Sequence, residues 1–215
     1  MTRKTIPLIY EILYDAFGPQ GWWPGESREE IIVGAVLTQN TNWKNVERAI
    51  ANLKASRALS LEKISKMPLD KTAALIRPSG YYNIKSQRLK SVADFFMQNF
   101  PGDLNKTGDI ATDELRSSLL NVHGVGPETA DSILLYALER PVFVVDAYTM
   151  RIGKRHAIIS EKDDYELVRA MFENSLERNV PLFNEYHALL VKVGKDLCRP
   201  RKAICEKCPL RRLLP

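Results

Sequence analysis

The sequence has no long uninterrupted hydrophobic run, and we do not expect its opening segment to act as a secretory signal. No stretch reaches the roughly 18 apolar residues that a membrane-spanning helix needs. The opening segment MTRKTIPLIYEILYDAFG contains basic residues but lacks a long apolar core and a small-residue cleavage site. We therefore expect a cytoplasmic protein that has no membrane partner.

Cysteine and strand-like runs are also scarce. The chain has three cysteines in 215 residues, all between positions 198 and 208, and their odd number and clustering argue against a disulfide framework. The one good strand-like run, VFVV at residues 142–145, is too short to make a sheet. Apolar residues instead recur with helical spacing, which predicts an all-α fold.

Two local signals mark helix starts. Ser27 and Glu30 have the spacing of a capping box, and Pro127 suits a first helical turn. We expect further helical segments at 6–17, 46–53, 84–96, 115–119, 127–140, 165–176 and 182–197.

Positive charge is concentrated near the C-terminus. The formal net charge is +5, and the residues from Lys192 to Pro215 include eight basic and two acidic side chains, a local net charge of +6. Such a block suits a polyanionic partner, although a charge run alone is more often a solvated tail.

The stretch LNVHGVGPETAD, residues 120–131, predicts a helix end, a tight hairpin and a second helix start. Gly124 and Gly126 would let backbone amides approach a ligand, and the first amides of the second helix are unpaired and partially positive. This combination favours an anion, commonly a phosphate. Val122 and Val125 are expected to hold the hairpin rigid. Taken alone, the pattern is more often an ordinary helix–turn–helix connection in which the glycines serve the turn.

Several linked segments resemble the endonuclease III superfamily of DNA glycosylases, which carries the helix–hairpin–helix and Gly/Pro–Asp signature. HGVGPETADSILLYAL followed by VFVVDAYTMRI resembles that signature, and VGAVLTQNTNW resembles the base-flipping helix and loop of the family. SGYYNIKSQRL is similar to its wedge loop, and YHALLVKVGKDLC with CRPRKAICEKC to its C-terminal helix and cysteine loop. The resemblance extends over residues 30–208.

The resemblance implies a monomeric base excision repair enzyme that acts on double-stranded DNA containing a damaged base. It would associate with the nucleoid when it acts. The implied architecture has two helical domains with the active-site cleft between them. Residues 24–135 would carry the base-flipping loops and the hairpin, and residues 1–23 with 136–215 the catalytic aspartate and the cysteine loop.

The resemblance assigns the catalytic carboxylate to Asp146. Family members extrude the base before they reach its glycosidic bond, and the departing base leaves positive charge on the sugar. A carboxylate beside C1′ stabilises that charge and can orient or activate water. Asp146 would also suit the N-cap of a helix from Ala147 onward, and the two roles are compatible. His187 is expected to be a satisfied buried histidine without a catalytic role.

Glu128 is the main departure from strand-cutting relatives. Those members read GVGxKTA, and their lysine forms a Schiff base at C1′, whereas this sequence reads GVGPETA. A carboxylate cannot form a Schiff base, so we expect a monofunctional enzyme that uses water. Glu128 would also suit the positive end of its helix, and it could help to position water or the base.

The candidate base pocket consists of Trp22, Trp23 and Trp43. A flipped base gains stacking energy between aromatic rings, and a positively charged alkylated purine gains cation–π attraction. The resemblance is closest to the 3-methyladenine branch, which also has glutamate in the lysine slot and aromatic residues near these positions. Any single tryptophan could instead be a core or rim residue.

Further candidate DNA contacts follow from the resemblance. Gln39 matches the residue that fills the space left by the flipped base, and Tyr81 and Tyr82 stand where the family inserts a wedge. Gln39 could instead be a polar helix end, and one tyrosine could pack in the core. Lys85 is a possible phosphate contact. The remaining candidates are Gly124, Val125, Gly126, Thr129 and Lys195.

The cysteine loop leaves the cofactor open. Cys198, Cys205 and Cys208 match the spacing of the family's [4Fe–4S] loop, but the position of the fourth cysteine is Leu214. Four thiolates are the usual ligand set. The alternatives are a cluster with an open or foreign fourth ligand, a labile cluster, a remnant loop with free thiols, or a zinc site completed by histidine.

Three other functions stay open at this point. The protein could be a glycosylase for mismatched or oxidised-guanine-paired bases, or a lyase-active enzyme of the endonuclease III type. It could also be a non-catalytic DNA-binding module that keeps only the hairpin.

Overall fold

The structure is a computed structural model that describes residues 2–22 and 25–214, and over these ranges it contains helices and loops but no strand. The predicted all-α fold is therefore confirmed. The chain forms two compact units, which we describe separately. Unit 1 comprises Met1–Trp22 with Pro141–Pro215, and unit 2 comprises Trp23–Arg140. No helix in the described ranges is long and apolar enough to cross a membrane.

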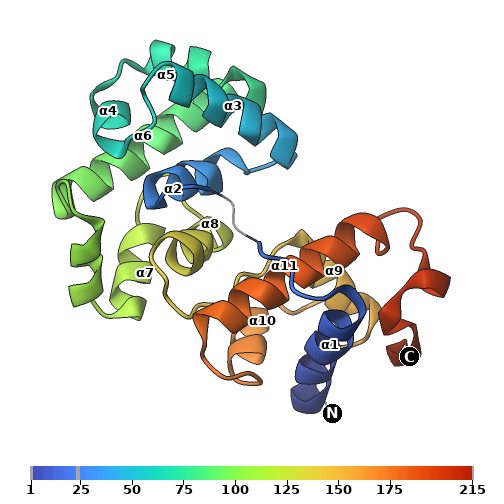
Figure 1. The fold of residues 1–215 in the computed structure, drawn as a ribbon. Helices are drawn as coiled ribbons and strands as arrows, with labels where there is room; N and C mark the ends of the chain where they lie inside the picture. Colours follow the sequence, from blue (N-terminus) through green and yellow to red (C-terminus); the bar gives the residue numbers. More distant parts are fainter. Residues whose placement is uncertain (1, 23–24, 215) are drawn as a thin grey trace. The chain divides into compact units, whose positions relative to one another are not determined.

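Unit 1 brings the two ends of the sequence together (Figure 1). Tyr186 is fully buried here, and its hydroxyl donates a hydrogen bond of 2.7 Å to the carbonyl of Ile6. The ring of Phe143 stacks on Phe172 with centroids 4.4 Å apart. The elements of unit 1 are α1 (Thr2–Phe17), α9 (Ala147–Arg155), α10 (Tyr165–Glu173), α11 (Val180–Asp196), η4 (Cys205–Lys207) and η5 (Pro209–Leu213).

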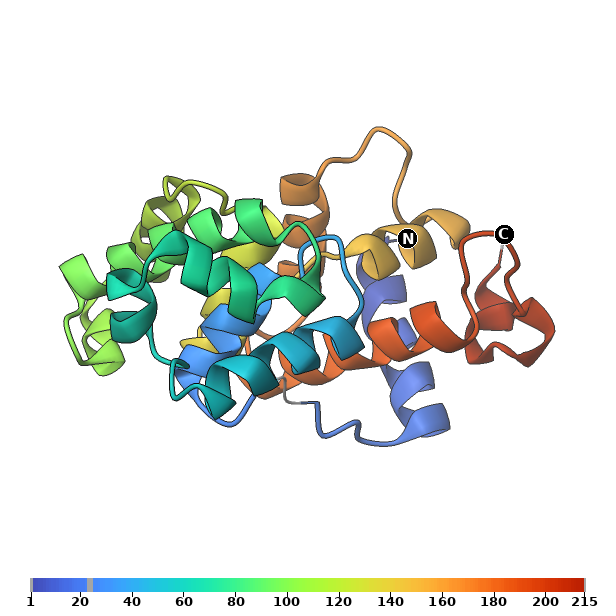
Figure 2. The same cartoon turned by 90° about the horizontal axis from the view of Figure 1, so that it is seen from above.

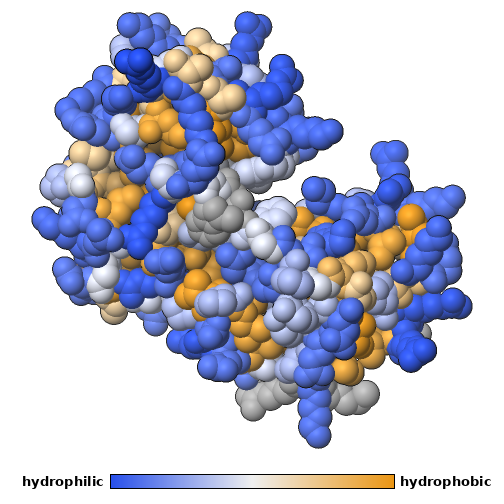
Figure 3. Space-filling model, in the orientation of Figure 1, coloured by the Kyte–Doolittle hydropathy of each residue, from blue (hydrophilic) through white to orange (hydrophobic). Residues whose placement is uncertain are grey.

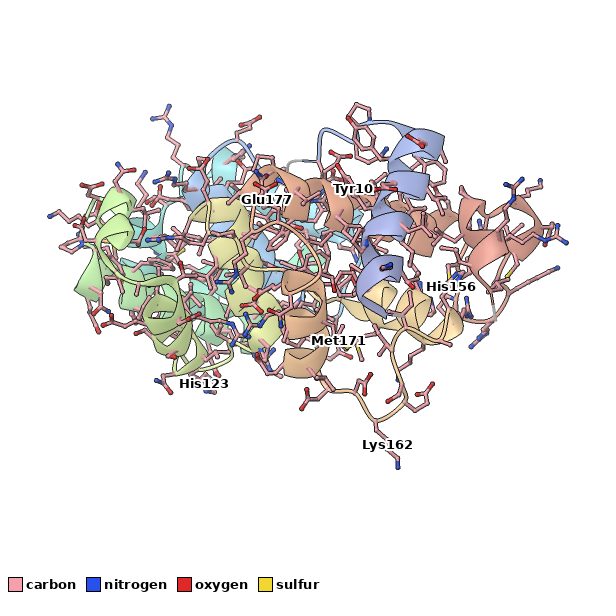
Figure 4. All side chains as sticks on the ribbon, turned by 90° about the horizontal axis from the view of Figure 1, so that it is seen from below. Tyr10, His123, His156, Lys162, Met171 and Glu177 are labelled. Carbon is pink, nitrogen blue, oxygen red and sulfur yellow. The ribbon has the colours of Figure 1, made fainter. Side chains whose placement is uncertain are left out.

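Helix α11 continues into the segment that carries the three cysteines (Figure 2). Lys162 projects from the loop between α9 and α10 into solvent (Figure 4). On the face shown in Figure 3, hydrophilic residues predominate and hydrophobic residues form smaller patches.

Unit 2 contains the remaining helices, with α2 packed against α3, α6 and the α8–η3 segment. Its elements are α2 (Arg28–Leu37), α3 (Trp43–Ala55), α4 (Leu61–Lys66), α5 (Leu69–Leu75), η1 (Arg77–Ser79), α6 (Tyr82–Asn99), η2 (Leu104–Asp109), α7 (Thr112–Leu120), α8 (Pro127–Ser132) and η3 (Ile133–Ala137).

The start of α2 shows how a local signal fixes a helix end. The Ser27 hydroxyl accepts a hydrogen bond of 3.2 Å from the Glu30 amide, which is the first half of the predicted capping box. The Glu30 carboxylate accepts from the Glu26 amide at 3.3 Å instead of completing the box on Ser27. It also lies 2.9 Å from the Lys54 ammonium, which ties α2 to α3.

The segment predicted as one helix over 127–140 differs in detail. α8 gives way at Ile133 to the π-helical segment η3, in which the Leu138 amide donates to the Ile133 carbonyl five residues earlier. All five residues of η3 are buried. Contacts also place residues 136–140 with unit 2, whereas the expected domain boundary followed residue 135.

A buried ion pair joins the two helices of the hairpin. Asp131 on α8 is fully buried and accepts from the Arg116 guanidinium of α7 at 2.6 and 3.1 Å. The paired geometry gives each charge a partner inside the protein, where an unpaired charge would be costly. This contact therefore holds α7 and α8 at a fixed separation on either side of the turn.

We predict that Arg116→Ala lowers the free energy of unfolding by about 3 kcal/mol, because it leaves the Asp131 carboxylate buried without this guanidinium. Urea unfolding followed by circular dichroism measures the effect. Lys66→Ala is the control, since it breaks the exposed pair with Glu62 and should change stability by less than about 1 kcal/mol. Equal effects of the two substitutions would contradict this interpretation of the pair.

Candidate active site and nucleic-acid interface

The segment before Asp146 is buried and, within the described residues, belongs to no helix or strand. Val142, Phe143, Val144 and Val145 are each at most 2% exposed. Buried backbone donors need partners, and side chains supply them here. The Phe143 amide donates to a carboxylate oxygen of Glu173 at 3.0 Å, and the Val145 amide donates to the Tyr165 hydroxyl at 3.4 Å. Contacts with α10 thus fix the chain that leads to Asp146.

Asp146 is the N-cap of α9 and is 9% exposed. Its Oδ1 accepts from the amide and the hydroxyl of Thr149 at 2.7 and 2.9 Å. Its Oδ2 lies 3.5 Å from Nε2 of His187. Burial by itself would raise the pKa of Asp146, but His187 and the hydrogen bonds from Thr149 outweigh burial and hold the pKa below its ordinary value. The structure therefore favours an ionised carboxylate at this position.

His187 comes close to Asp146 because α9 and α11 pack together. Gly194 on α11 makes this approach possible, since a Cβ there would lie 2.2 Å from Cδ1 of Tyr148. The Arg151 guanidinium of α9 also donates to the Gly194 carbonyl at 3.0 Å. Sequence reasoning gave His187 no part in the site, and no local signal links it to Asp146.

The predicted hairpin lies between α7 and α8 in unit 2. Gly124 has φ +83°, a conformation that favours glycine, and Val125 is buried as expected. Gly126 is the N-cap of α8 and, lacking a side chain, makes no side-chain cap. The first amides of α8 are thus not capped from that position. His123 projects from the hairpin into solvent (Figure 4).

Gln39 contacts the hairpin directly. Its Nε2 donates to the Gly124 carbonyl and to the Thr129 hydroxyl, each at 3.0 Å. Its Oε1 accepts from Nη1 of Arg88 at 2.6 Å. Thr129 is only 6% exposed, so it supports Gln39 in this structure and is not an exposed contact. The structure thus brings together three predicted DNA-binding residues, and it adds Arg88, which sequence reasoning missed.

The two tyrosines of the predicted wedge loop differ in their exposure to solvent. Tyr81 is 67% exposed with φ 47°, a strained backbone for a tyrosine. Tyr82 is half-buried, with the Arg77 guanidinium over its ring at 5.8 Å. Ile84 is also exposed. Tyr81 is therefore the more accessible of the two candidate tyrosines.

The position of Lys85 contradicts the expectation that it could contact a DNA phosphate. The residue is 1% exposed, and its ammonium donates to the carbonyls of Leu37 and Ser79 at 2.8 and 2.7 Å. Burial, with a smaller contribution from Arg88, lowers the pKa of Lys85 to about 8. An ammonium enclosed in this way does not reach a DNA phosphate, whereas Lys195, near the end of α11, is exposed.

The candidate base-pocket tryptophans belong to different parts of the chain. Trp43 begins α3, is half-buried and lines an open groove of about 510 Å³ in unit 2. Trp22 is half-buried in unit 1, and Trp23 lies outside the described residues. The groove also contains Gly25, Glu26, Glu30, Glu47, Ile50, Ala51 and Lys54.

Glu128 lies in the first turn of α8 and is exposed. Its carbonyl accepts from the Ser132 hydroxyl at 2.7 Å. An acidic side chain is stabilised at this end of a helix, so the helix position predicted for Glu128 is correct.

The three cysteines line one small cavity of about 20 Å³ in unit 1, with His156 and Leu214. Within residues 2–22 and 25–214, no group of three or more His, Cys, Asp or Glu side chains could hold a metal ion. The Cys198 thiol sulfur accepts from Nη1 of Arg155 at 3.1 Å, and burial raises the pKa of the Cys208 thiol. Nδ1 of His156 lies 3.2 Å from the Leu213 carbonyl.

These cysteine-loop residues do not fit a four-thiolate cluster. A cluster needs deprotonated thiols, and Leu214 offers no ligand atom at the fourth position.

The chain resembles known proteins in sequence and in fold. The pattern of the HhH-GPD superfamily base excision DNA repair proteins matches residues 33–178. A Methanocaldococcus jannaschii protein that carries the name of a DNA repair glycosylase is 51% identical over 205 residues, which cover 94% of this chain and 92% of that protein.

Two solved structures have similar folds. The H. pylori 3-methyladenine DNA glycosylase bound to 1,N6-ethenoadenine superposes with a TM-score of 0.75 and 29% identity, covering 90% of this chain and 97% of that one. An endonuclease III–DNA complex superposes with a TM-score of 0.84, covering 100% and 95%. Its 19% identity supports similarity of fold alone.

The burial of Lys85 leads to a prediction about salt dependence. Each phosphate contact contributes roughly 0.9 to the slope of log K against log salt concentration. We expect Lys195→Met to reduce the slope for duplex binding by about 1 and Lys85→Met to leave it unchanged. Fluorescence anisotropy over a salt series measures both. A slope reduced by Lys85→Met in a folded variant would restore Lys85 as a phosphate contact.

Proposed function

The chain belongs to the HhH-GPD superfamily of base excision DNA repair proteins, and from this premise we propose that it is a monofunctional DNA glycosylase. It would hydrolyse the bond between a flipped, damaged base and its sugar and leave the DNA backbone intact. The base would be an alkylated purine such as 3-methyladenine, and the partner double-stranded DNA containing that lesion.

The Asp146 carboxylate carries this proposal. It is largely buried, it is held by Thr149 and His187, and its pKa is lowered, so it bears negative charge at neutral pH. Such a fixed charge stabilises the positive charge that develops on the sugar as the base departs. Oδ1 accepts two hydrogen bonds from Thr149, whereas Oδ2, among the described residues, has only the longer 3.5 Å contact with His187. Oδ2 is therefore the oxygen better suited to face the sugar or a water molecule.

Glu128 supports hydrolysis without strand cleavage. A lyase needs an amine that adds to C1′ and forms an imine. Strand-cutting members of the resembled family have a lysine at this position. This chain has the carboxylate of Glu128 there, in the first turn of α8. Water is therefore the proposed nucleophile for base removal.

The groove beside Trp43 supports an alkylated purine as the substrate. Among the described residues, its lining contains three carboxylates, those of Glu26, Glu30 and Glu47, and one ammonium, that of Lys54. An alkylated purine carries positive charge, which a negatively charged groove with an aromatic wall attracts. The 29% identical H. pylori enzyme is named as a 3-methyladenine glycosylase, which agrees with this choice.

We predict that Asp146→Asn slows base release from alkylated duplex about 100- to 1,000-fold, because it removes the charge while asparagine still suits an N-cap. Binding of the lesion duplex should be retained. Single-turnover release read by chromatography, with anisotropy for binding, measures both quantities.

Asp164→Asn is the matched control, since Asp164 is also an N-cap aspartate of unit 1 and accepts from the Leu167 amide at 2.8 Å. It should leave the release rate unchanged. The panel should include duplexes with mismatched and oxidised bases. Release from those alone would overturn the alkylated-purine proposal, and no release from any duplex would overturn glycosylase activity.

For Glu128, we predict that Glu128→Lys creates a covalent complex with abasic DNA that borohydride can trap, whereas the unmodified protein gives none. The new amine would add to the sugar aldehyde, and loss of water would form the imine that borohydride reduces. Glu114→Lys, an equal charge change in the first turn of α7, should not be trapped. Trapping by the unmodified protein would sink the monofunctional proposal.

A further inference from the structure

The Gln39 carboxamide is fully engaged within unit 2. Both of its N–H donors bind the hairpin segment, one at the Gly124 carbonyl and one at the Thr129 hydroxyl. Its oxygen accepts a charge-assisted hydrogen bond from Arg88. In this arrangement Gln39 joins the turn after α2 to a hairpin that lies 85 residues further along the chain.

Arg88 contacts both partners of this bridge. Its aliphatic stem lies directly over Gly124, where a Cβ would come within 2.1 Å of the Arg88 Cγ and 2.7 Å of its Cδ. Glycine at 124 therefore makes room for Arg88 in addition to allowing the turn. From this position the guanidinium reaches Oε1 of Gln39 at 2.6 Å.

The placement of Arg88 is not explained by stability alone. Its Nε is buried and has no hydrogen-bond partner among the described residues. Burying a donor in this way is unfavourable for folding. A buried donor without a partner calls for an explanation. We explain it here by a function of the contact between Arg88 and Gln39.

Lys85 lies one helical turn before Arg88 on α6, and it fixes the end of α2, where the segment that carries Gln39 begins. Its ammonium binds the carbonyl of Leu37, at the end of α2, and the carbonyl of Ser79, just before the wedge residue Tyr81. Two successive basic residues on one face of α6 therefore hold the segments that carry Gln39 and Tyr81. Because the end of α2 is fixed, Gln39 has mainly its side-chain torsions left to vary.

We infer that Arg88 is a positioning residue for base removal. By holding the Gln39 carboxamide against Gly124, it makes the turn after α2 and the hairpin bind the duplex as one body. This inference rests on the proposed function, because it assigns the hairpin to the phosphates and Gln39 to the space left by the flipped base.

The experiment is a double-mutant cycle of Arg88→Met and Gln39→Ala. Methionine keeps a stem over Gly124 while it removes the guanidinium. Three measurements are made on each protein: single-turnover base release, fluorescence of 2-aminopurine placed opposite the lesion, and hydrogen exchange of residues 121–127 without DNA. Thermal unfolding establishes that each variant is folded.

We expect each single variant to release base about tenfold more slowly and the double variant to be no slower than the slower single variant, because the two residues act through one contact. The 2-aminopurine signal should change in both single variants, and the hairpin amides should exchange faster in both. Arg88→Lys should restore part of the rate, since an ammonium can still donate to Gln39.

Lys90→Met is the matched control. It removes the same charge from α6, but Lys90 faces Ser65 and Asp94, so rate, fluorescence and exchange should stay unchanged. A roughly hundredfold additive loss in the double variant, or an Arg88→Met protein that behaves like Lys90→Met, would overturn the inference. If the unmodified protein releases no base, the proposed function fails. The hydrogen-exchange cycle then decides by itself whether Arg88 joins Gln39 to the hairpin.

Discussion

A buried carboxylate must be compensated, and this constraint governs the structure around Asp146. Desolvation alone would favour the protonated acid, but the N-terminal end of α9, Thr149 and His187 favour the anion instead. Each of these groups depends on a further contact. α9 begins where the buried segment 142–145 is fixed by α10, and His187 is near because Gly194 lets α11 approach Tyr148. The packing of unit 1 thus serves to hold one negative charge.

In unit 2, side-chain contacts hold the hairpin and the turn after α2 in place. Arg116 and Asp131 hold the helices on either side of the hairpin, and Gln39 ties the hairpin to the end of α2. Two features of the structure require glycine at position 124, namely its left-handed backbone and the Arg88 stem that lies over it. Contacts that look local in the sequence therefore depend on a side chain from α6.

Local chemistry made much of the fold predictable. The period of the apolar residues indicated the helices, and Ser27, Pro127 and Asp146 stand at helix starts, as capping rules expect. Glu128 likewise lies in the first turn of its helix.

Contacts between distant side chains were not predictable in the same way. The approach of His187 to Asp146 depends on helix packing, and the bridge between Gln39 and the hairpin on a single arginine. The charge pattern did not reveal that Lys85 is buried, because a long stem can carry its ammonium inward as easily as outward. Nor did spacing show that the three cysteines fall short of a metal-binding group among the described residues.

The most direct measurement is the pKa of the Asp146 side chain itself. Its carboxyl carbon can be followed by NMR through a pH titration, with Asp146→Asn used to assign the resonance. The account predicts a pKa below the ordinary aspartate value of 3.8, so that the carboxylate is ionised throughout the neutral range. A pKa above 3.8 would show that burial outweighs Thr149 and His187 and would contradict this account of the site, and only a pKa near or above neutral pH would show that the carboxylate is not held in charged form for base removal.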